Sequence, residues 1–569
     1  MEEGKGEAEK EESQRECLKM EDFLNYLKET VKTHKNKNCY VSAIFYADKV
    51  VSLHRNYESE SYIDATYELA DCYFLNNEYL RAVQLIEKTG LGYYNEKFRT
   101  LFAQAYFSAG NIDECINVLK SEETNGFQLE HEIDRFSNYH QYTYYEGLKA
   151  LILGKAYESQ ENKDFAVKYF TQSLSYNCEN IEAFDRLICN FLLSHDEKKH
   201  LLDKIGFSEK NLWLKDYYRS RIEETMLASE LREGLVNVEE EESGVKKRGE
   251  DENKLKSILD ILQENNNNDI LFIEAENLYK KQNCGRSLEL IKRMLEGDFY
   301  YLKIMPLYCA CLIELEKTGD LYYLAHKLVT SNPHIAVSWF AVGSYYFLIK
   351  KYDIGRKYFQ KANQLDKHFC ASWMAFGHCY AAQNESDQAM AAYRTAARLF
   401  PGCYLANVCI GMEYLRTNNL KTANISFDEA LKIYDQDPCI YNEKGVVLYK
   451  SRVHDQAKTL FKRSLTCCYD MNSPTYETIC KNLGNCYRKL KNYNKAIEYY
   501  EKCLRINPKS ASSYTALGFA YHLTGGFKDA LDCYHKASYL KSDDSLTTEL
   551  IAKAIQDINS VSVDVAYFN

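Results

Sequence analysis

Small and aromatic residues recur in this chain at a fixed interval, which indicates a repeated structural unit. A glycine returns every 34 residues, with one longer step of 39, at Gly343, Gly377, Gly411, Gly445, Gly484 and Gly518. A small residue follows each glycine after 12 positions: Gly355, Ala389, Ala423, Ala457, Ala496 and Ala530. An aromatic residue follows each glycine after 16 positions: Phe359, Tyr393, Phe427, Phe461, Tyr500 and Tyr534. Six frames agree at once, so the pattern is far more specific than any single frame.

This frame predicts pairs of antiparallel helices, A and B, and is the signature of the tetratricopeptide repeat (TPR). A glycine inside a helix costs about 1 kcal/mol relative to alanine, so its recurrence calls for a packing reason. With the glycine counted as position 8, we expect it and the small residue at position 20 to lie where the two helices approach most closely. Aromatic residues at positions 4, 11 and 24 then fill the gaps. The predicted fold is an all-α TPR solenoid, a right-handed superhelix of helix pairs.

The same frame continues towards the N-terminus with a weaker consensus. Ala275 and Cys309 occupy the glycine position of two earlier repeats, and Ala70, Ala103 and Gly154 occupy it in three N-terminal ones. We therefore expect about 12–14 repeats. A closing helix is predicted near residues 545–558, where it would cover the last apolar face.

The domains expected from this pattern follow one another along the chain. They are an acidic, disordered tail (1–20), an N-terminal TPR array (21–204), a charged helix and loop insertion (205–268), a C-terminal TPR superhelix (269–544), and a capping helix with a tail (545–569). Within the insertion, residues 233–253 are predicted to form a loop, and its phosphorylation stays an open question.

Composition narrows the class of protein. The net charge of −11 over 569 residues argues against a general nucleic-acid binder. The charged first 20 residues have no apolar core of a signal peptide, and the longest apolar-leaning run, 336–349, is too short to span a membrane. We expect a protein of the nucleus and cytoplasm whose 20 cysteines are reduced.

Common motifs of catalytic and nucleotide-binding sites are absent from the sequence. It contains no GxxxxGK[ST], HExxH or GxSxG pattern, and its cysteines and histidines do not have the spacing of zinc ligands. About 30 residues follow the last repeat, which is too few for a catalytic domain. We therefore expect no enzyme activity, no cofactor and no metal, and interpret the chain as a scaffold that binds other proteins.

A TPR scaffold recognises its ligands on the concave face, which positions 2, 5, 9 and 12 of the A helices line. In the C-terminal repeats, the candidate groove for a partner peptide is formed by His378, Met412, Asn442, Tyr449, Lys481, Asn485, Arg488, Thr515, Phe519 and His522. Amides, aromatic rings and a few cations suit the backbone and apolar side chains of an extended peptide. The alternative is that about half of these residues only shape the superhelix and do not contact a ligand.

A chaperone adaptor is one alternative function for such an array. Adaptors of that class hold a C-terminal carboxylate with lysine at position 5 and asparagine at position 9, which Lys481 and Asn485 match. The next repeat must then supply an asparagine at position 6, where this chain has Ala516. The clamp is therefore incomplete.

Several stretches resemble one particular family beyond the generic repeat. NPHIAVSWFAVGSYYFL (332–348), SDQAMAAYRTAARLFPGC (386–403), IGMEYLRTNN (410–419) and NLGNCYRKLKNYNKAIEYY (482–500) are similar to the cell division cycle protein 16 family. Shorter stretches such as SAIFYADKVVSL (42–53) add to the resemblance, which runs from about residue 40 to 545. Members of that family are TPR subunits of the anaphase-promoting complex, or cyclosome.

The resemblance implies a non-catalytic scaffold in this cell-cycle ubiquitin ligase. In the family, the N-terminal repeats form a homodimer, and the C-terminal superhelix encloses the N-terminus of a small subunit of the cell division cycle protein 26 type. Other TPR subunits stack on its outer faces. Asn442, Tyr449, Asn485 and Arg488 are the groove residues that we carry over first. A sister TPR subunit of the same complex, or an unrelated assembly hub, stays the alternative.

Overall fold

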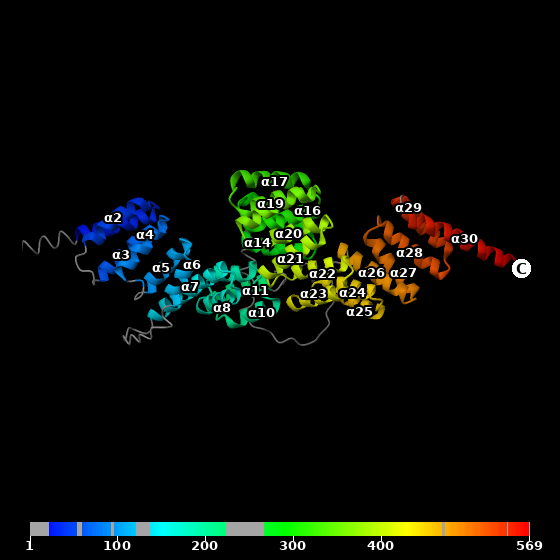
Figure 1. The fold of residues 1–569 in the computed structure, drawn as a ribbon, viewed down its shortest axis with the longest axis horizontal. Helices are drawn as coiled ribbons and strands as arrows, with labels where there is room; N and C mark the ends of the chain where they lie inside the picture. Colours follow the sequence, from blue (N-terminus) through cyan, green and yellow to red (C-terminus); the bar gives the residue numbers. More distant parts are fainter. Residues whose placement is uncertain are drawn as a thin grey trace, which may run out of the picture. The chain divides into compact units, whose positions relative to one another are not determined.

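The structure is a computed structural model that describes residues 22–53, 60–90, 92, 96–120, 137–222, 267–468, 471, 473–542 and 544–567. These residues form helices and turns, with no strand among them (Figure 1). The predicted all-α fold is confirmed. The predictions of a tail at 1–20 and a loop at 233–253 lie outside the described residues.

Two compact units divide the chain. The N-terminal unit comprises residues 1–187 and 204–206, and the C-terminal unit comprises 188–203 and 207–569. Residues 22–36 of the N-terminal unit are helical. Its further helices are α2 (Tyr40–Leu53), α3 (Glu60–Leu75), α4 (Tyr79–Thr89), α5 (Glu96–Ser108), α6 (Ile112–Lys120), α7 (Ser137–Ser159) and α8 (Lys163–Tyr176), followed by the start of α9 (Ile181–Cys189).

The C-terminal unit contains the regular repeats. It begins with α10 (His195–Lys204), η2 (Glu209–Asn211) and α11 (Leu212–Ile222). The repeats then follow as helix pairs: α14 (Asn268–Lys280) and α15 (Cys284–Gly297), α16 (Met305–Glu314, after η4, Leu302–Ile304) and α17 (Thr318–Ser331), α18 (Ala336–Leu348) and α19 (Tyr352–Leu365), α20 (Cys370–Ala382) and α21 (Ser386–Leu399), α22 (Tyr404–Arg416) and α23 (Leu420–Ile433), α24 (Pro438–Lys450) and α25 (His454–Thr466), α26 (Pro474–Lys489) and α27 (Tyr493–Ile506), and α28 (Ala511–Thr524) and α29 (Phe527–Leu540).

The contact between position 8 and position 24 explains the recurring glycine. A Cβ atom added at Gly411 would stand 2.6 Å from the ring of Phe427, and one added at Gly484 would stand 2.6 Å from the ring of Tyr500. The same contact joins Gly343 to Phe359, Gly377 to Tyr393, Gly445 to Phe461, Gly518 to Tyr534 and, in the N-terminal unit, Gly154 to Phe170. The predicted close approach of the helices at position 8 is confirmed, and a buried ring fills the space.

A residue in the left-handed conformation ends helix A in both units. It stands seven positions after position 8 and has a φ near +60° at Lys350 and Arg452, for example. The equivalent turns contain Asn38, Asn77, Gly110, Glu161, Gln282, Glu316, Asn384, Asn418, Lys491 and Gly525. These twelve turns mark twelve helix pairs in the described residues, at the lower end of the predicted number.

The boundary between the compact units falls at residues 187/188, and residues 204–206 return to the N-terminal unit. Residues 188–203 belong to the C-terminal unit, where the backbone N–H of Gly402 donates to the carbonyl of Phe191 over 2.6 Å. A Cβ atom at position 402 would overlap the carbonyl oxygen of Leu193. Glycine at 402 is therefore what lets the segment 191–193 lie against the regular repeats.

The closing helix is present as α30 (Ser545–Tyr567), which starts where it was predicted and runs longer. It packs on α29 through a small apolar cluster of Ala530, Tyr534 and Ala554. It also contacts α28, so it takes the place that helix A of a further repeat would take. Within the described residues, no helix is long and apolar enough to cross a membrane.

Candidate functional site

The A helices of the C-terminal unit carry all ten predicted groove residues, on α20, α22, α24, α26 and α28. Several successive A helices contact one another directly: α18 and α20, α22 and α24, α24 and α26, and α26 and α28. Successive B helices make no comparable contacts in the described part of this unit. Closer spacing of the A helices puts them on the inner side of the curve, the face on which the candidate groove residues were predicted to lie.

Position 9 of these helices has a structural task that the sequence analysis did not identify. The hydroxyl of Tyr500 donates to the side-chain oxygen of Asn485 over 2.8 Å, and the hydroxyl of Tyr393 lies 2.7 Å from Nδ1 of His378. Both tyrosines stand at position 24 and are buried. A buried hydroxyl needs a partner, and His378 and Asn485 supply it for these two tyrosines.

The environment keeps His378 and its partner uncharged. Part of the His378 residue reaches the surface, but its imidazole ring is buried beside Tyr393, and this burial lowers the pKa of the imidazole to about 4. Burial raises the pKa of Tyr393 well above its usual range. The pair is therefore neutral at physiological pH, and the tyrosine hydroxyl keeps its proton as a donor.

Apolar surface accompanies these polar groups on the A-helix face. In the next repeat, position 24 is Phe427, which has no hydroxyl to satisfy, and position 9 is Met412. The Met412 side chain is 47% exposed. A flexible thioether of this kind adapts to the side chains of a ligand.

Asn442 belongs to a buried amide chain instead of lying open. Its side-chain NH₂ donates to Glu443 over 3.0 Å, and its oxygen accepts from Asn482, one repeat further on, over 2.9 Å. Burial raises the pKa of Glu443 above its ordinary value. The chain of hydrogen bonds ties α24 to α26 and leaves Asn442 only 4% exposed.

Cations and aromatic rings meet in the last two regular repeats. Nζ of Lys481 donates to the hydroxyl of Ser512 over 2.6 Å. The guanidinium of Arg488 lies 5.0 Å from the centre of the Phe519 ring. Burial raises the pKa of Tyr449, and the charge of Arg488 partly opposes that rise. The structure thus brings Tyr449, Arg488 and Phe519 into one neighbourhood.

Thr515 and His522 face the closing helix. The hydroxyls of Thr515 and Thr547 lie 3.2 Å apart, and Nε2 of His522 lies 2.8 Å from a carboxylate oxygen of Asp557. Thr547 and Asp557 both belong to α30. These two predicted groove residues therefore help to hold α30 in place.

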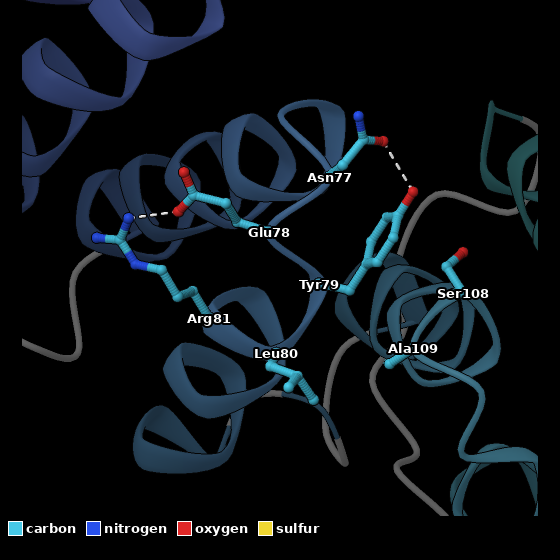
Figure 2. A pocket seen from close by; sticks show the side chains of 7 residues that line it. All are labelled: Asn77, Glu78, Tyr79, Leu80, Arg81, Ser108 and Ala109. Carbon is cyan, nitrogen blue, oxygen red and sulfur yellow. Dashed lines mark hydrogen bonds and ion pairs between the residues drawn. The ribbon is translucent and has the colours of Figure 1, made fainter.

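A hollow in the N-terminal unit was not predicted from the sequence. It has a volume of about 480 Å³ and lies between the start of α4 and the end of α5, lined by Asn77, Glu78, Tyr79, Leu80, Arg81, Ser108 and Ala109 (Figure 2). Tyr79 donates to Asn77 over 2.8 Å, and Glu78 pairs with Arg81. No motif marks it, because it forms where two A–B turns stand side by side.

Neither the A-helix face nor the hollow in the N-terminal unit contains a cluster of metal-ligating side chains among the described residues. Within the described residues, no group of three or more histidine, cysteine, aspartate or glutamate side chains could hold a metal ion.

Family models match four segments of the chain. Residues 36–122 match the model described as anaphase-promoting complex, cyclosome, subunit 3, and residues 374–438, 478–510 and 499–532 match tetratricopeptide repeat models. The repeat models fall on α20 to α23 and on α26 to the start of α29.

Relatives and a solved structure match nearly the whole chain. Anaphase-promoting complex subunit 6 of Arabidopsis thaliana is 33% identical over 552 residues, which cover 96% of this chain and 98% of the relative. The human cell division cycle protein 16 homolog is 31% identical, over 94% of this chain and 84% of that protein. A crystal structure described as the APC/C hetero-tetramer Cut9-Hcn1 matches with a TM-score of 0.72 and 27% identity, covering 93% of this chain and 96% of that chain. The chain therefore belongs to the anaphase-promoting complex subunit 6 family, the family of cell division cycle protein 16.

Proposed function

We propose that this chain is a non-catalytic scaffold subunit of the anaphase-promoting complex, a cell-cycle ubiquitin ligase. The observation that carries the proposal is the match to Cut9-Hcn1 over 93% of this chain. A TPR solenoid acts by presenting surfaces, because each repeat contacts only its neighbours and the stack offers extended faces. Its proposed location, in the nucleus and cytoplasm, is tested by imaging a fluorescent fusion.

The A-helix face of the C-terminal unit is the proposed site for a small subunit of the cell division cycle protein 26 type, as an extended N-terminal segment. The face combines exposed apolar surface at Met412 with polar groups at Lys481 and Asn485, which suits the side chains and backbone of an extended peptide. The hetero-tetramer described for Cut9 and Hcn1 contains two kinds of chain, which supports a separate partner.

The N-terminal unit is the proposed homodimer contact. Its helix α2 exposes two large apolar side chains, Val41 at 73% and Phe45 at 58%, and α4 exposes Leu80 at 64%. Apolar side chains exposed in one region are typical of protein–protein contacts. In a symmetric dimer, each copy uses the same patch of surface.

One experiment with two variants tests both assignments. Arg488→Glu should abolish co-purification of the small subunit and leave the dimer intact, because it reverses a charge on the proposed groove. The double variant Val41→Glu/Phe45→Glu should do the reverse, because it puts charges into the proposed dimer contact. Light scattering after gel filtration gives the oligomeric state, and a pull-down with mass spectrometry gives the partner.

Matched controls for these variants lie on the same molecule. Arg505→Glu changes an exposed arginine on the neighbouring B helix α27, and Ile425→Glu changes an exposed apolar residue on α23. Both should leave dimer and partner unchanged. Loss of dimerisation by Arg488→Glu, with the partner retained, would contradict the assignment of the two units.

A sister TPR subunit of the same complex is the second candidate. The observation in its favour is the subunit 3 model that matches residues 36–122. Copurified peptides decide between the two, because a sister subunit would be recovered together with a separate chain that matches subunit 6 along its whole length.

A further inference from the structure

Unpaired polar atoms gather at the end of the regular repeats. Among the described residues, Nε of Arg488, Nδ1 of His522 and the hydroxyl of Tyr534 are buried without a hydrogen-bond partner. The Arg488 guanidinium lies over Phe519, and the rings of His522 and Tyr534 are 6.4 Å apart. Phe519 and His522 stand three residues apart on α28 and so link the two contacts. We call Arg488, Phe519, His522 and Tyr534 the terminal cluster. Buried polar atoms in native proteins are almost always paired, so several orphans in one place call for a cause.

Tyr534 departs from the rule that the other repeats follow. Tyr393 and Tyr500, also at position 24, find their partners at position 9 on His378 and Asn485. In the last repeat, position 9 is Phe519, which offers no acceptor. Burial raises the pKa of Tyr534 to about 12, so its hydroxyl keeps a proton to donate. The last repeat thus holds a buried donor that its own fold does not use.

Arg488 has no counter-ion in the part of the chain that the structure describes. Arg416, by contrast, pairs with Glu413 over 2.5 Å, and Arg356 pairs with Asp353 over 3.2 Å. The face of Phe519 holds the Arg488 guanidinium by a cation–π contact but supplies no negative charge. Partly burying a cation without an anion is costly, and an incoming carboxylate would recover that cost.

His522 contributes the opposite kind of hydrogen-bonding group. Its Nε2 lies 2.8 Å from Asp557, so in the neutral ring this nitrogen carries the proton and Nδ1 is an acceptor. The cluster therefore combines two donors, on Arg488 and Tyr534, with one acceptor. Two donors suit a carboxylate, and an acceptor suits a backbone N–H, so the set fits an acidic residue of a peptide better than a free anion.

We propose that the terminal cluster binds the carboxylate of an aspartate or glutamate in the peptide that occupies the A-helix face. The inference rests on the proposed function, because it names the chemistry of one position in that same ligand. Arg488 and Tyr534 donate to the carboxylate, and Nδ1 of His522 accepts from the peptide backbone. The bound residue lies near the α30 end of the groove.

The test measures coupling between Arg488 and single carboxylates of a peptide. The probe is a synthetic peptide with the N-terminal sequence of the small subunit that co-purifies with this chain, labelled for fluorescence anisotropy, with each acidic residue replaced in turn by its amide. For the unmodified full-length chain, one replacement should weaken binding about ten- to a hundred-fold, as expected for a charged hydrogen bond. The variant Arg488→Gln should bind the parent peptide that much more weakly and should be indifferent to the same replacement.

Controls and contrary outcomes separate the inference from the proposed function. Arg505→Gln on α27 should bind every peptide as the unmodified chain does. If Arg488→Gln weakens all peptides equally, or none, the carboxylate assignment is overturned while the groove stands. If only a phosphorylated peptide responds to Arg488, the ligand class is wrong. If the unmodified chain binds no form of the peptide, the proposed groove fails as well.

Tyr534→Phe gives a second readout that a purely structural role would not produce. The variant removes a buried hydroxyl without a partner, so the free chain should melt at the same temperature or higher. Its affinity for the parent peptide should nevertheless fall, by about five-fold or more. Unchanged affinity with a raised melting temperature would remove Tyr534 from the site.

Discussion

The regular repeats of the C-terminal unit and the irregular repeats of the N-terminal unit fill the space between positions 8 and 24 with different pairs of residues. In the C-terminal unit, Gly411 faces the ring of Phe427. In the N-terminal unit, Ala103 occupies position 8 and Leu119 position 24, and both are buried. A larger residue at one position accompanies a smaller one at the other.

Other repeats extend the comparison across the boundary between the units. Gly154 in the N-terminal unit faces Phe170, as in the regular repeats. Ala275 and Ile291 share a core cluster in the C-terminal unit, and so do Cys309 and Ala325. In most of these repeats the combined volume of positions 8 and 24 is therefore similar, and glycine occurs where position 24 is an aromatic ring. Cys309 with Ala325, two small residues, is an exception.

The largest expected effect comes from breaking a glycine–ring contact. Gly411→Leu should destabilise the C-terminal unit by about 3 kcal/mol, because the buried Phe427 ring leaves no room for a side chain. Thermal unfolding followed by circular dichroism measures the change. Gly319→Leu on α17 is the matched control, because no atom lies within 4 Å of a Cβ there. Helix propensity alone favours leucine over glycine at both positions, so an unchanged or raised stability of Gly411→Leu would contradict the packing explanation.

A pair of compensating substitutions at positions 8 and 24 should have a smaller effect on stability. Gly411→Ala/Phe427→Leu converts a regular repeat to the pair found at Ala103 and Leu119. The double variant should be more stable than the sum of the single variants predicts, by a coupling of about 1 kcal/mol. Strict additivity in a double-mutant cycle of unfolding free energies would show that the two positions do not share one volume.

The smallest effect concerns a turn that both units share. Lys350 holds a left-handed conformation, which costs a residue with a Cβ about 1 kcal/mol. Glycine avoids this cost but loses more backbone entropy on folding, and that loss cancels about half of the gain. Lys350→Gly should therefore stabilise the chain by about 0.5 kcal/mol, and Gly525→Lys should destabilise it similarly. Melting temperatures that shift in the same direction for both variants would contradict this account of the turn.

Much of the fold could be predicted, because the repeat places small and large residues at fixed intervals. The left-handed turns escaped the sequence analysis, since only two of the twelve, at Gly110 and Gly525, have the glycine that marks such a turn. The role of Gly402 also escaped it, because its contact with Phe191 and Leu193 joins segments far apart in the sequence. The periodic pattern indicates which residues are neighbours within a repeat, but it does not indicate contacts between segments that are far apart in the sequence.

The candidate site could be predicted only as a face. Position 9 was expected to serve a ligand, and the structure adds that His378 and Asn485 satisfy buried tyrosine hydroxyls. Thr515 and His522 pack against α30, since the closing helix takes the place of a further A helix. Tyr534 was assigned to the core, and its unpaired hydroxyl is visible only when all three tyrosine repeats are compared.

Native affinity purification of the tagged chain from dividing cells, with quantitative mass spectrometry, is the decisive test of the proposed scaffold role. The account predicts other TPR subunits together with a cullin-like subunit, a RING subunit and a small subunit of the cell division cycle protein 26 type. Recovery of chaperones alone, or of an assembly without ubiquitin-ligase subunits, would contradict the proposed role and leave only the fold and the family.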